Sequence, residues 1–391
     1  MLSDPCTIKD VENQSKEKAI IGCLLGTAIG DALGLSYEGL SKQRLIKLYP
    51  ALNQYHFIFG KGMVSDDTEH TCLLAQSLIA SLGDVEIFKK SFAWKLRFWL
   101  LGLPAGVGFA TLRAILKLGL GFSPDKSGVF SAGNGPTMRS AIIGVCYGHD
   151  VEKLCQLVKA ATHITHTDPK AEFCALAVAL AAYLSSLNKL VSPQEYLEKL
   201  QEWQMAKLRS RQVYGEQRIA KLRSRQVYGE WQTAEELIAL IKKTIESVWK
   251  GESTAVFAET LGLKNGVSGY VYHTVPVVIH VWLRNQDDYQ SAILDIIRCG
   301  GDTDTTAAIV GGIIGARVGK QGIPKQWLDN LWEFPRHIKW MEKLGMRLNQ
   351  VCCFGFKQKA LPISIIGVLL RNFIFMIIVL WHGFRRLLPP Y

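Results

Sequence analysis

Two runs of glycine spaced four residues apart constrain the fold more than any other feature of this 391-residue sequence. Residues four apart lie on one face of an α-helix, and glycine has no side chain, so a second backbone can approach such a face closely. The runs therefore predict that an early helix lies side by side with a late one. Their members are Gly22, Gly26, Gly30 and Gly34, then Gly311, Gly315 and Gly319.

Most of the remaining chain also predicts helices. Val271–Trp282 is rich in β-branched residues, but Pro276 argues against a central strand, and no alternation of strands and helices occurs. We therefore expect an all-α fold: a compact multi-helix domain followed by a C-terminal hydrophobic helix. The stretches that are long, apolar on one face and rich in helix formers are Thr71–Leu82, Ala171–Leu187, Ala234–Trp249 and Asp288–Ile297.

Composition indicates a reduced, globular protein. Charged residues make up 20% of the chain and hydrophobic residues 48%, which excludes a disordered protein. The nine cysteines show no Cys-x-x-Cys pair and no zinc-binding spacing, so we expect neither a disulfide scaffold nor a zinc site. No apolar run precedes Ile20, so no signal peptide is predicted and a cytoplasmic location is expected.

The formal charge of +11 does not predict nucleic-acid binding. Seven Lys/Arg and two Asp/Glu fall within Met205–Gln232, and five Lys/Arg with no acid fall within Phe356–Tyr391. The rest of the chain is nearly neutral, so a basic groove for a phosphate backbone has no support there. We expect no nucleic-acid partner.

Residues 205–232 contain a tandem repeat. Ala206–Glu216 (AKLRSRQVYGE) recurs as Ala220–Glu230, a period of 14 residues, whereas a repeat architecture needs at least three units. Fourteen residues advance an α-helix by about four full turns less 40°. A surface helix can therefore accommodate the insertion while the residues after it keep nearly the same orientation. We interpret the segment as a solvated helix or loop extension without a catalytic part.

The chemistry is expected at two acidic clusters, Ser65-Asp66-Asp67-Thr68-Glu69 and Gly301-Asp302-Thr303-Asp304-Thr305. Adjacent carboxylates repel one another, and placing several beside apolar helices is costly unless cations compensate. Oxygen ligands alone favour a hard ion such as Mg²⁺ or Mn²⁺. The alternative is helix capping by Ser65 or Asp67 and by Asp302 or Asp304. A capping residue still offers its remaining oxygens to a metal.

Five motifs in this order resemble the ADP-ribosylglycohydrolase family: GCLLGTAIGDALGLSYEG, SDDTEH, SAGNGPTMR, THTDP and CGGDTDTTAAIVGGIIGA. The resemblance implies an all-α catalytic domain over residues 17–345, with 205–232 as an insertion, and two divalent cations, Mg²⁺ or Mn²⁺, between the first and last acidic motifs. Ser65 stands where the family usually has threonine, and the hydroxyl is retained. The implied cation ligands are Ser65, Asp66, Asp67, Asp302, Asp304 and Thr305.

The other implied site residues surround these ligands. Glu38 matches an acidic residue of a loop that closes over the site in the family, and either Glu38 or Asp304 is the implied general acid or base. Residues 133–139 match a diphosphate-binding loop, in which glycines let N–H groups face a phosphate. Pro136 replaces a common glycine there and removes one N–H donor. The implied substrate contacts are Gly133, Asn134, Gly135, Thr137, Met138 and His166, with His163 as the alternative histidine.

The resemblance thus implies a metal-dependent hydrolase that cleaves the glycosidic bond between ADP-ribose and an acceptor. Its expected partner is an ADP-ribosylated protein or a small ADP-ribose derivative. One alternative is a catalytically silent relative with a binding or structural role, which would be expected to lose carboxylates; all four aspartates of the implied metal site are present here. A phosphoesterase is the other alternative, and the glycine–asparagine loop and the motif order argue against it.

Residues 361–388 form a hydrophobic tail beyond the resemblance. Within it, residues 363–381 are long enough to span a bilayer, but Arg371 offsets much of the gain from the apolar side chains. The sequence favours a membrane anchor with the catalytic domain facing the cytoplasm, because Lys357 and Lys359 precede the span. The alternatives are a helix packed on the domain with Arg371 reaching solvent, or one lying in the interface. Truncation after Ala360 is expected to leave an active enzyme.

Overall fold

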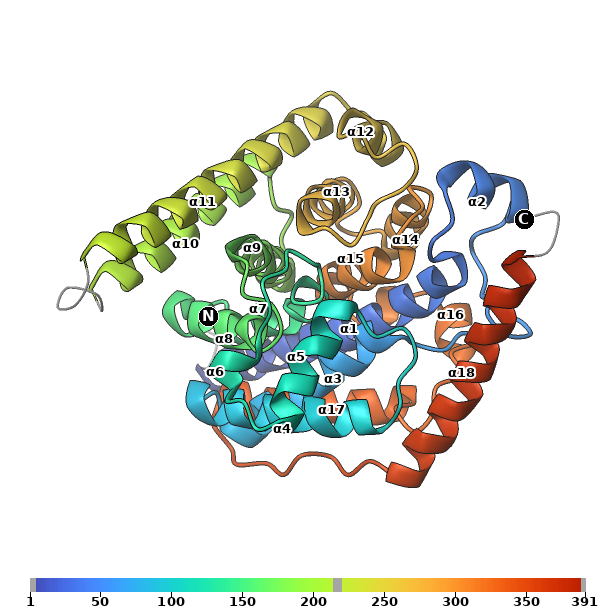
Figure 1. Ribbon diagram of the computed structural model, residues 1–391, viewed down its shortest axis with the longest axis horizontal. Coiled ribbons are helices and arrows are strands. Elements are labelled where there is room, and N and C mark those ends of the chain that lie inside the picture. The colour runs from blue at the N-terminus through green and yellow to red at the C-terminus, as the bar shows by residue number, and fades with distance from the viewer. Residues whose placement is uncertain (1–4, 214–219, 388–391) are drawn as a thin grey trace.

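A computed structural model describes residues 5–213 and 220–387 of the protein, and within them the chain is helical, with isolated β-bridges as its extended pairing (Figure 1). The all-α expectation is confirmed. The first half forms α1 (Pro5–Gly34), η1 (Leu35–Tyr37), α2 (Lys42–Leu48), α3 (Asp66–Ser81), α4 (Val85–Leu101), α5 (Phe109–Gly119), α6 (Pro124–Ser127), η2 (Thr137–Arg139), α7 (Ala141–Tyr147), α8 (Val151–His163) and α9 (Pro169–Ser186). The second half forms α10 (Pro193–Val213), α11 (Ala220–Trp249), α12 (Thr254–Thr260), α13 (Val271–Arg284), α14 (Tyr289–Ile297), α15 (Thr303–Val318), η3 (Lys320–Gly322), α16 (Lys325–Asp329), α17 (Ile338–Phe354) and α18 (Ile365–Leu387).

The centre of the fold is the pair of helices α1 and α15. A Cβ added at Gly26 would lie 2.1 Å from the carbonyl oxygen of Gly311, and one added at Gly22 would lie 2.0 Å from that of Gly315. The backbones are therefore in direct contact, which only glycine permits. The predicted pairing of an early with a late helix is confirmed, and it brings the start of α15 next to the end of α1.

The other helices pack around this pair. α3, α7 and α17 contact α1, whereas α9, α13 and α14 contact α15. α9 is apolar on all sides, so it is buried nearly throughout. Two described helical segments are long and apolar enough to cross a membrane. Residues 14–37 are almost wholly buried and belong to this core, whereas residues 365–385 are mostly not buried.

The β-branched segment at 271–282 is helical. α13 runs through Pro276, and nearly all of its side chains are buried against neighbouring helices. Burial of a β-branched helix is favourable enough to override its weak helix propensity. The proline removes one N–H donor and leaves the helix continuous.

The repeat lies on a hairpin formed by α10 and α11, which projects from the body of the molecule (Figure 1). The first copy begins in α10 and the second lies at the start of α11; residues 214–219 between them fall outside the described part. The two copies therefore occupy two helices, not one lengthened helix. Lys207 of the first copy is buried beside Glu172, with its Nζ atom 3.2 Å from the carboxylate.

The C-terminal helix packs on the domain with one face, and this corrects the two places expected for Arg371. Its side chain lies neither in a bilayer nor in solvent: it is 3% exposed and donates to both carboxylate oxygens of Glu333, at 3.0 and 2.9 Å. Asn372 donates to the carbonyl oxygen of Gly102 at 2.7 Å. Arg371 and Asn372, the two polar residues that make insertion into a bilayer unfavourable, are therefore the residues that bind α18 to the domain.

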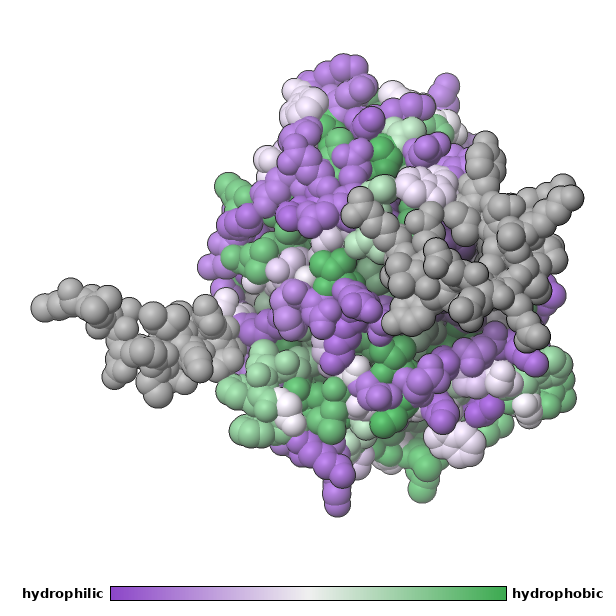
Figure 2. Space-filling model, turned by 90° about the vertical axis from the view of Figure 1, so that its left-hand side faces the viewer, coloured by the Kyte–Doolittle hydropathy of each residue, from purple (hydrophilic) through white to green (hydrophobic). Residues whose placement is uncertain are grey.

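The two sides of the molecule differ in polarity. Figure 2 shows the side of the molecule that lies at the left in Figure 1. This face carries mainly hydrophilic residues in its upper part and separate hydrophobic patches below. On the opposite side, the outer face of α18 is a continuous apolar stripe. It consists of Ile365, Ile366, Leu369, Leu370, Phe373, Ile377, Leu380, Trp381 and Phe384.

Candidate active site

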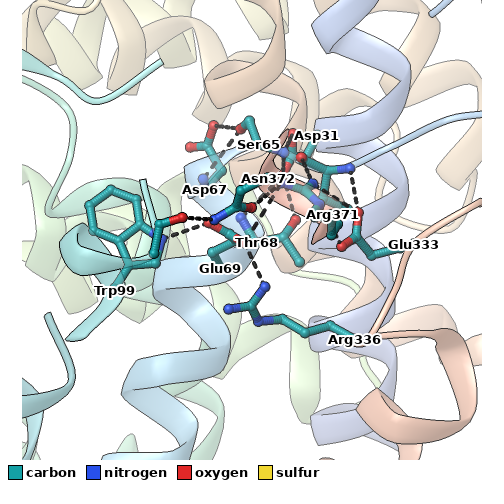
Figure 3. A network of polar contacts seen from close by, with 12 residues as sticks. Asp31, Ser65, Asp67, Thr68, Glu69, Trp99, Glu333, Arg336, Arg371 and Asn372 are labelled. Carbon is teal, nitrogen blue, oxygen red and sulfur yellow. Dashed lines mark hydrogen bonds and ion pairs between the residues drawn. The ribbon is translucent and has the colours of Figure 1, made fainter. Parts of the chain in front are cut away.

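The N-terminus of α3 is held by its own cap and by Asp31 of α1 (Figure 3). The Ser65 hydroxyl accepts from the N–H of Asp67 at 3.3 Å, and the Ser65 N–H donates to Asp31 Oδ1 at 2.9 Å. Thr68 donates to Asp31 Oδ2 through its N–H at 3.1 Å and its hydroxyl at 2.5 Å. These partners satisfy the first donors of the helix, so α3 begins at Asp66 and not at Thr71.

A glycine turn positions the N-terminus of α15. Gly301 has φ +85°, and a Cβ there would lie 2.1 Å from the Val267 carbonyl oxygen, so this position accepts only glycine. The Gly301 N–H donates to the Leu40 carbonyl and its carbonyl accepts from the Gly39 N–H, both at 2.8 Å. These bonds place the loop that carries Glu38 beside the second acidic cluster.

The two acidic clusters meet, as the predicted pairing of the glycine helices requires. The hydroxyl of Thr305 donates to Asp67 Oδ2 at 3.2 Å, and the hydroxyl of Ser65 donates to the same oxygen at 2.9 Å. Burial raises the pKa of Asp66, Asp67 and Asp304 well above the ordinary value, and neighbouring carboxylates raise each of them further.

The donor set fits a hard divalent cation. Asp67 Oδ1 and Asp304 Oδ1 are buried and make no hydrogen bond. A buried acceptor without a partner is costly, and a cation satisfies it. In the described residues, no group of three or more His, Cys, Asp or Glu side chains is arranged closely enough to hold a metal ion as it stands. Beyond the effect of burial, the carboxylates raise one another's pKa, but in the described residues they do not converge into a closed set of ligands.

The capping alternative holds for one cluster. Ser65 caps α3, but Asp302, the residue just before α15, makes no capping hydrogen bond with its side chain. Its Oδ2 instead accepts from Asn134 Nδ2 at 2.6 Å. This bond joins the second acidic cluster to the glycine loop of residues 133–139.

The glycine loop is anchored from several sides. The Asn134 N–H donates to the Gly269 carbonyl at 2.9 Å, and the Asn134 carbonyl accepts from the Thr137 hydroxyl at 2.5 Å. Arg139 is buried and donates to the Ala161 carbonyl and the Thr165 hydroxyl. Thr137 therefore closes the loop on itself, and Arg139 ties its end to α8 and to Thr165.

His166 lies against the loop. Cβ atoms added at Gly133 or Gly135 would each come within 3.1 Å of its ring, so a side chain at either position would crowd the ring. Its Nδ1 lies 2.8 Å from the Thr165 hydroxyl, and burial lowers the pKa of His166 to about 3, with Arg139 adding to the effect. The ring is therefore neutral. His163 instead pairs with Glu172 at 2.8 Å.

One cavity of about 510 Å³ brings most of the predicted residues together. Ser65, Asp67 and Thr137 are buried behind its wall. Residues that the sequence did not single out also line it, among them Phe109, Arg113 and Phe130. The predicted residues on the lining are Glu38, Asp66, Gly133, Asn134, Gly135, Met138, His166, Asp302, Asp304 and Thr305.

Asp31 is a further residue that sequence reasoning missed. It is fully buried and accepts every hydrogen bond that holds the Ser65–Thr68 turn to α1. A signal for it exists, because it is the one charged residue between Lys18 and Glu38. An isolated carboxylate in an apolar helix requires buried donors. No comparable signal marks Phe109 or Phe130.

Comparison with known proteins decides the family. A sequence profile described as ADP-ribosylglycohydrolase matches residues 12–354. The chain belongs to the ADP-ribosylglycohydrolase family. The match covers both acidic clusters, the glycine loop and His166, and it ends before α18 begins.

Individual relatives agree with this family. The ADP-ribosylhydrolase ARH3 of Gallus gallus is 26% identical, over 85% of this chain and 93% of its own. The ADP-ribosyl-[dinitrogen reductase] glycohydrolase of Rhodospirillum rubrum is 26% identical, over 80% of this chain and 89% of its own. A solved ADP-ribosylglycohydrolase-related protein complex has the same fold, with a TM-score of 0.60 at 22% identity, over 87% of this chain and 99% of that one. This family member is a glycohydrolase enzyme.

Proposed function

We propose that this glycohydrolase is metal-dependent and releases ADP-ribose from a modified acceptor. The observation that carries the proposal is the single cavity whose lining combines acidic oxygens with the glycine loop, joined by the 2.6 Å bond between Asn134 and Asp302. ADP-ribose requires both features at once, because its diphosphate needs N–H donors and its distal ribose needs a site for hydroxyl groups.

The residues that would hold two cations are the oxygens of both clusters. Asp66, Asp302, Asp304 and Thr305 line the cavity, and Ser65 and Asp67 support them from behind. Mg²⁺ or Mn²⁺ held by these oxygens would supply the means to orient ribose hydroxyls and to polarise a water molecule. The buried oxygens of Asp67 and Asp304 that make no hydrogen bond support this assignment.

The chain's own groups supply positioning and proton transfer. The glycine loop would bind the diphosphate and His166 the adjacent ribose, so the acceptor bond is placed beside the acidic clusters. Cleavage develops positive charge on the sugar, which nearby carboxylates stabilise. Glu38 is exposed and lines the cavity, so we assign to it the proton exchanged with water. Asp304 is buried and is assigned to cation binding.

The test is release of ADP-ribose by the full chain from arginine-linked and serine-linked ADP-ribosyl peptides, with Mg²⁺ or Mn²⁺ present. Asp302→Ala and Asp304→Ala are expected to lower kcat/KM by more than the about 100-fold that loss of an outer metal partner costs. Glu38→Gln should lower kcat while cation binding persists. The exposed Glu235→Ala is the control and should change neither quantity. Full activity in excess EDTA, or release from no acceptor, would refute the proposal.

We also propose that the enzyme acts on the cytoplasmic side of a membrane to which the outer face of α18 binds. That face is apolar along the whole helix, and no acidic residue occurs between Phe356 and Leu387. Lys357, Lys359 and Arg385 flank it with positive charge, which suits anionic lipid headgroups. Because Arg371 and Asn372 bind the domain, the helix would lie in the interface and not span the bilayer.

A further inference from the structure

One residue just before the first acidic cluster is held at both of its backbone polar groups. The N–H of Val64 donates to Glu333 Oε2 at 3.2 Å, and its carbonyl accepts from Nη2 of Arg371. Arg371 and Glu333 also bind each other through two hydrogen bonds, at 3.0 and 2.9 Å. All three residues are buried, so Arg371 and Glu333 form a closed clamp on the Val64 peptide groups. Figure 3 shows the Arg371 and Glu333 side chains next to each other.

The clamp is next to the candidate cation ligands. Ser65 follows Val64 directly, and its hydroxyl donates to Asp67 at 2.9 Å. Asp31 holds the N–H of Ser65 on the other side. The start of α3 is thus fixed by α1 through Asp31 and by α18 through Arg371. A displacement of Val64 would carry Ser65 and Asp66 with it.

A second contact extends this link. Glu69, one turn into α3, receives hydrogen bonds from Trp99 and Arg336 at 2.6 and 2.5 Å, and Nη1 of Arg371 lies 3.8 Å from its carboxylate. Two arginines and two glutamates therefore form one buried, charge-balanced group beneath the first turn of α3. Removing one member leaves a buried charge without compensation.

We propose that Arg371 is a positioning residue for the cation-binding segment at residues 65–67, acting through the Val64 carbonyl and Glu333. It lies outside the residues that match the family, so the appended helix contributes to the site's geometry as well as to the surface. The inference rests on the cation site proposed above. Outer partners of metal ligands typically change metal affinity by about 10–100-fold when removed.

The experiment measures Mn²⁺ affinity of the purified full chain by electron paramagnetic resonance. Arg371→Met keeps the apolar stem and removes the donors, and it should weaken Mn²⁺ binding by about 10-fold. Saturating Mn²⁺ should restore much of the lost kcat, which loss of fold would not allow. Ile378→Ala is the matched control, because Ile378 is buried on the same helix against a different cluster. It should leave the affinity within about two-fold, because the change removes apolar contacts and leaves the hydrogen bonds to Val64 in place.

Three results separate the possible failures. If the wild-type chain binds no Mn²⁺, the proposed cation site is wrong. If the wild type binds Mn²⁺ and Arg371→Met binds as tightly as Ile378→Ala, the positioning role is refuted and the proposed function stands. If Arg371→Met does not fold, Arg371→Lys tests the role instead, because lysine keeps the positive charge but lacks the several N–H donors of the guanidinium group. Its affinity should lie below that of Ile378→Ala, and equality would refute the role.

Discussion

At the scale of single residues, the contact between α1 and α15 depends on atoms that glycine lacks. At Gly26 the obstacle to a side chain is the carbonyl of Gly311, which belongs to a helix backbone and cannot rotate away. Gly229 in α11 has the opposite surroundings, since a Cβ there meets nothing within 4 Å. The same residue type is thus indispensable at one position and replaceable at the other.

This contrast makes a pair of predictions about stability. Gly26→Ala should lower the free energy of unfolding by about 3 kcal/mol or more, because the two central helices must separate. Gly229→Ala should raise it by about 0.5–1 kcal/mol, because alanine restricts the unfolded chain and suits a helix. Chemical denaturation of both variants checks the signs. Equal stability of Gly26→Ala and the wild type would contradict the close packing.

At the scale of elements, the hairpin of α10 and α11 shows how an insertion is tolerated. Lys207 at the start of the first copy pairs with Glu172, and its Nζ lies 3.3 Å from the ring centroid of Phe173. The second copy carries Lys221 at the same place in its sequence. Removing Ala206–Ile219 would join Met205 to Ala220, so Lys221 takes the position of Lys207 and the hairpin is shortened.

Deletion of Ala206–Ile219 is therefore expected to leave ADP-ribose release within a few-fold of the wild type. The comparison is Lys207→Met in the full chain, which leaves Glu172 buried without this cation and should cost about 3 kcal/mol in unfolding free energy. Thermal unfolding and peptide hydrolysis are measured on both. A deletion variant as unstable as Lys207→Met would show that the second copy cannot replace the first.

At the scale of the whole molecule, the proposal to test is that the outer face of α18 binds a membrane. If this face binds lipid in the plane of the interface, the full chain should float with vesicles that contain phosphatidylserine. An alkaline wash should release it, because no segment spans the bilayer. Ile377→Glu, at a position 52% exposed, should abolish flotation without lowering stability.

The matched control is Trp94→Glu, which places the same charge at an exposed aromatic of α4. It should leave flotation unchanged. Resistance of the wild-type chain to alkaline washing would instead indicate a spanning helix, with Arg371 withdrawn from Glu333. Absence of the chain from vesicles of any composition would refute the lipid-binding face.

The sequence by itself determined the features that depend on local spacing and residue type. Sequence reasoning identified helix periodicity, the two glycine runs, both acidic clusters and the glycine loop, because each depends on a few neighbouring residues. The meeting of the two acidic clusters followed from the predicted pairing of the early and the late glycine helix, whereas the place of the glycine loop in the same cavity did not. The lining by Phe109 and Phe130 did not follow, since nothing in the local pattern aims a side chain at a distant cavity.

Only the tertiary structure decided where the costly polar groups go. A buried arginine is unfavourable in a bilayer and in a protein interior alike, so composition could not assign Arg371 to either. Glu333 and the Val64 carbonyl decide it, and they become its partners only when α18 packs on the domain. The same holds for Asp31, whose donors lie more than 30 residues away in the chain. A polar residue's partner is a property of the fold, because it depends on which segments meet.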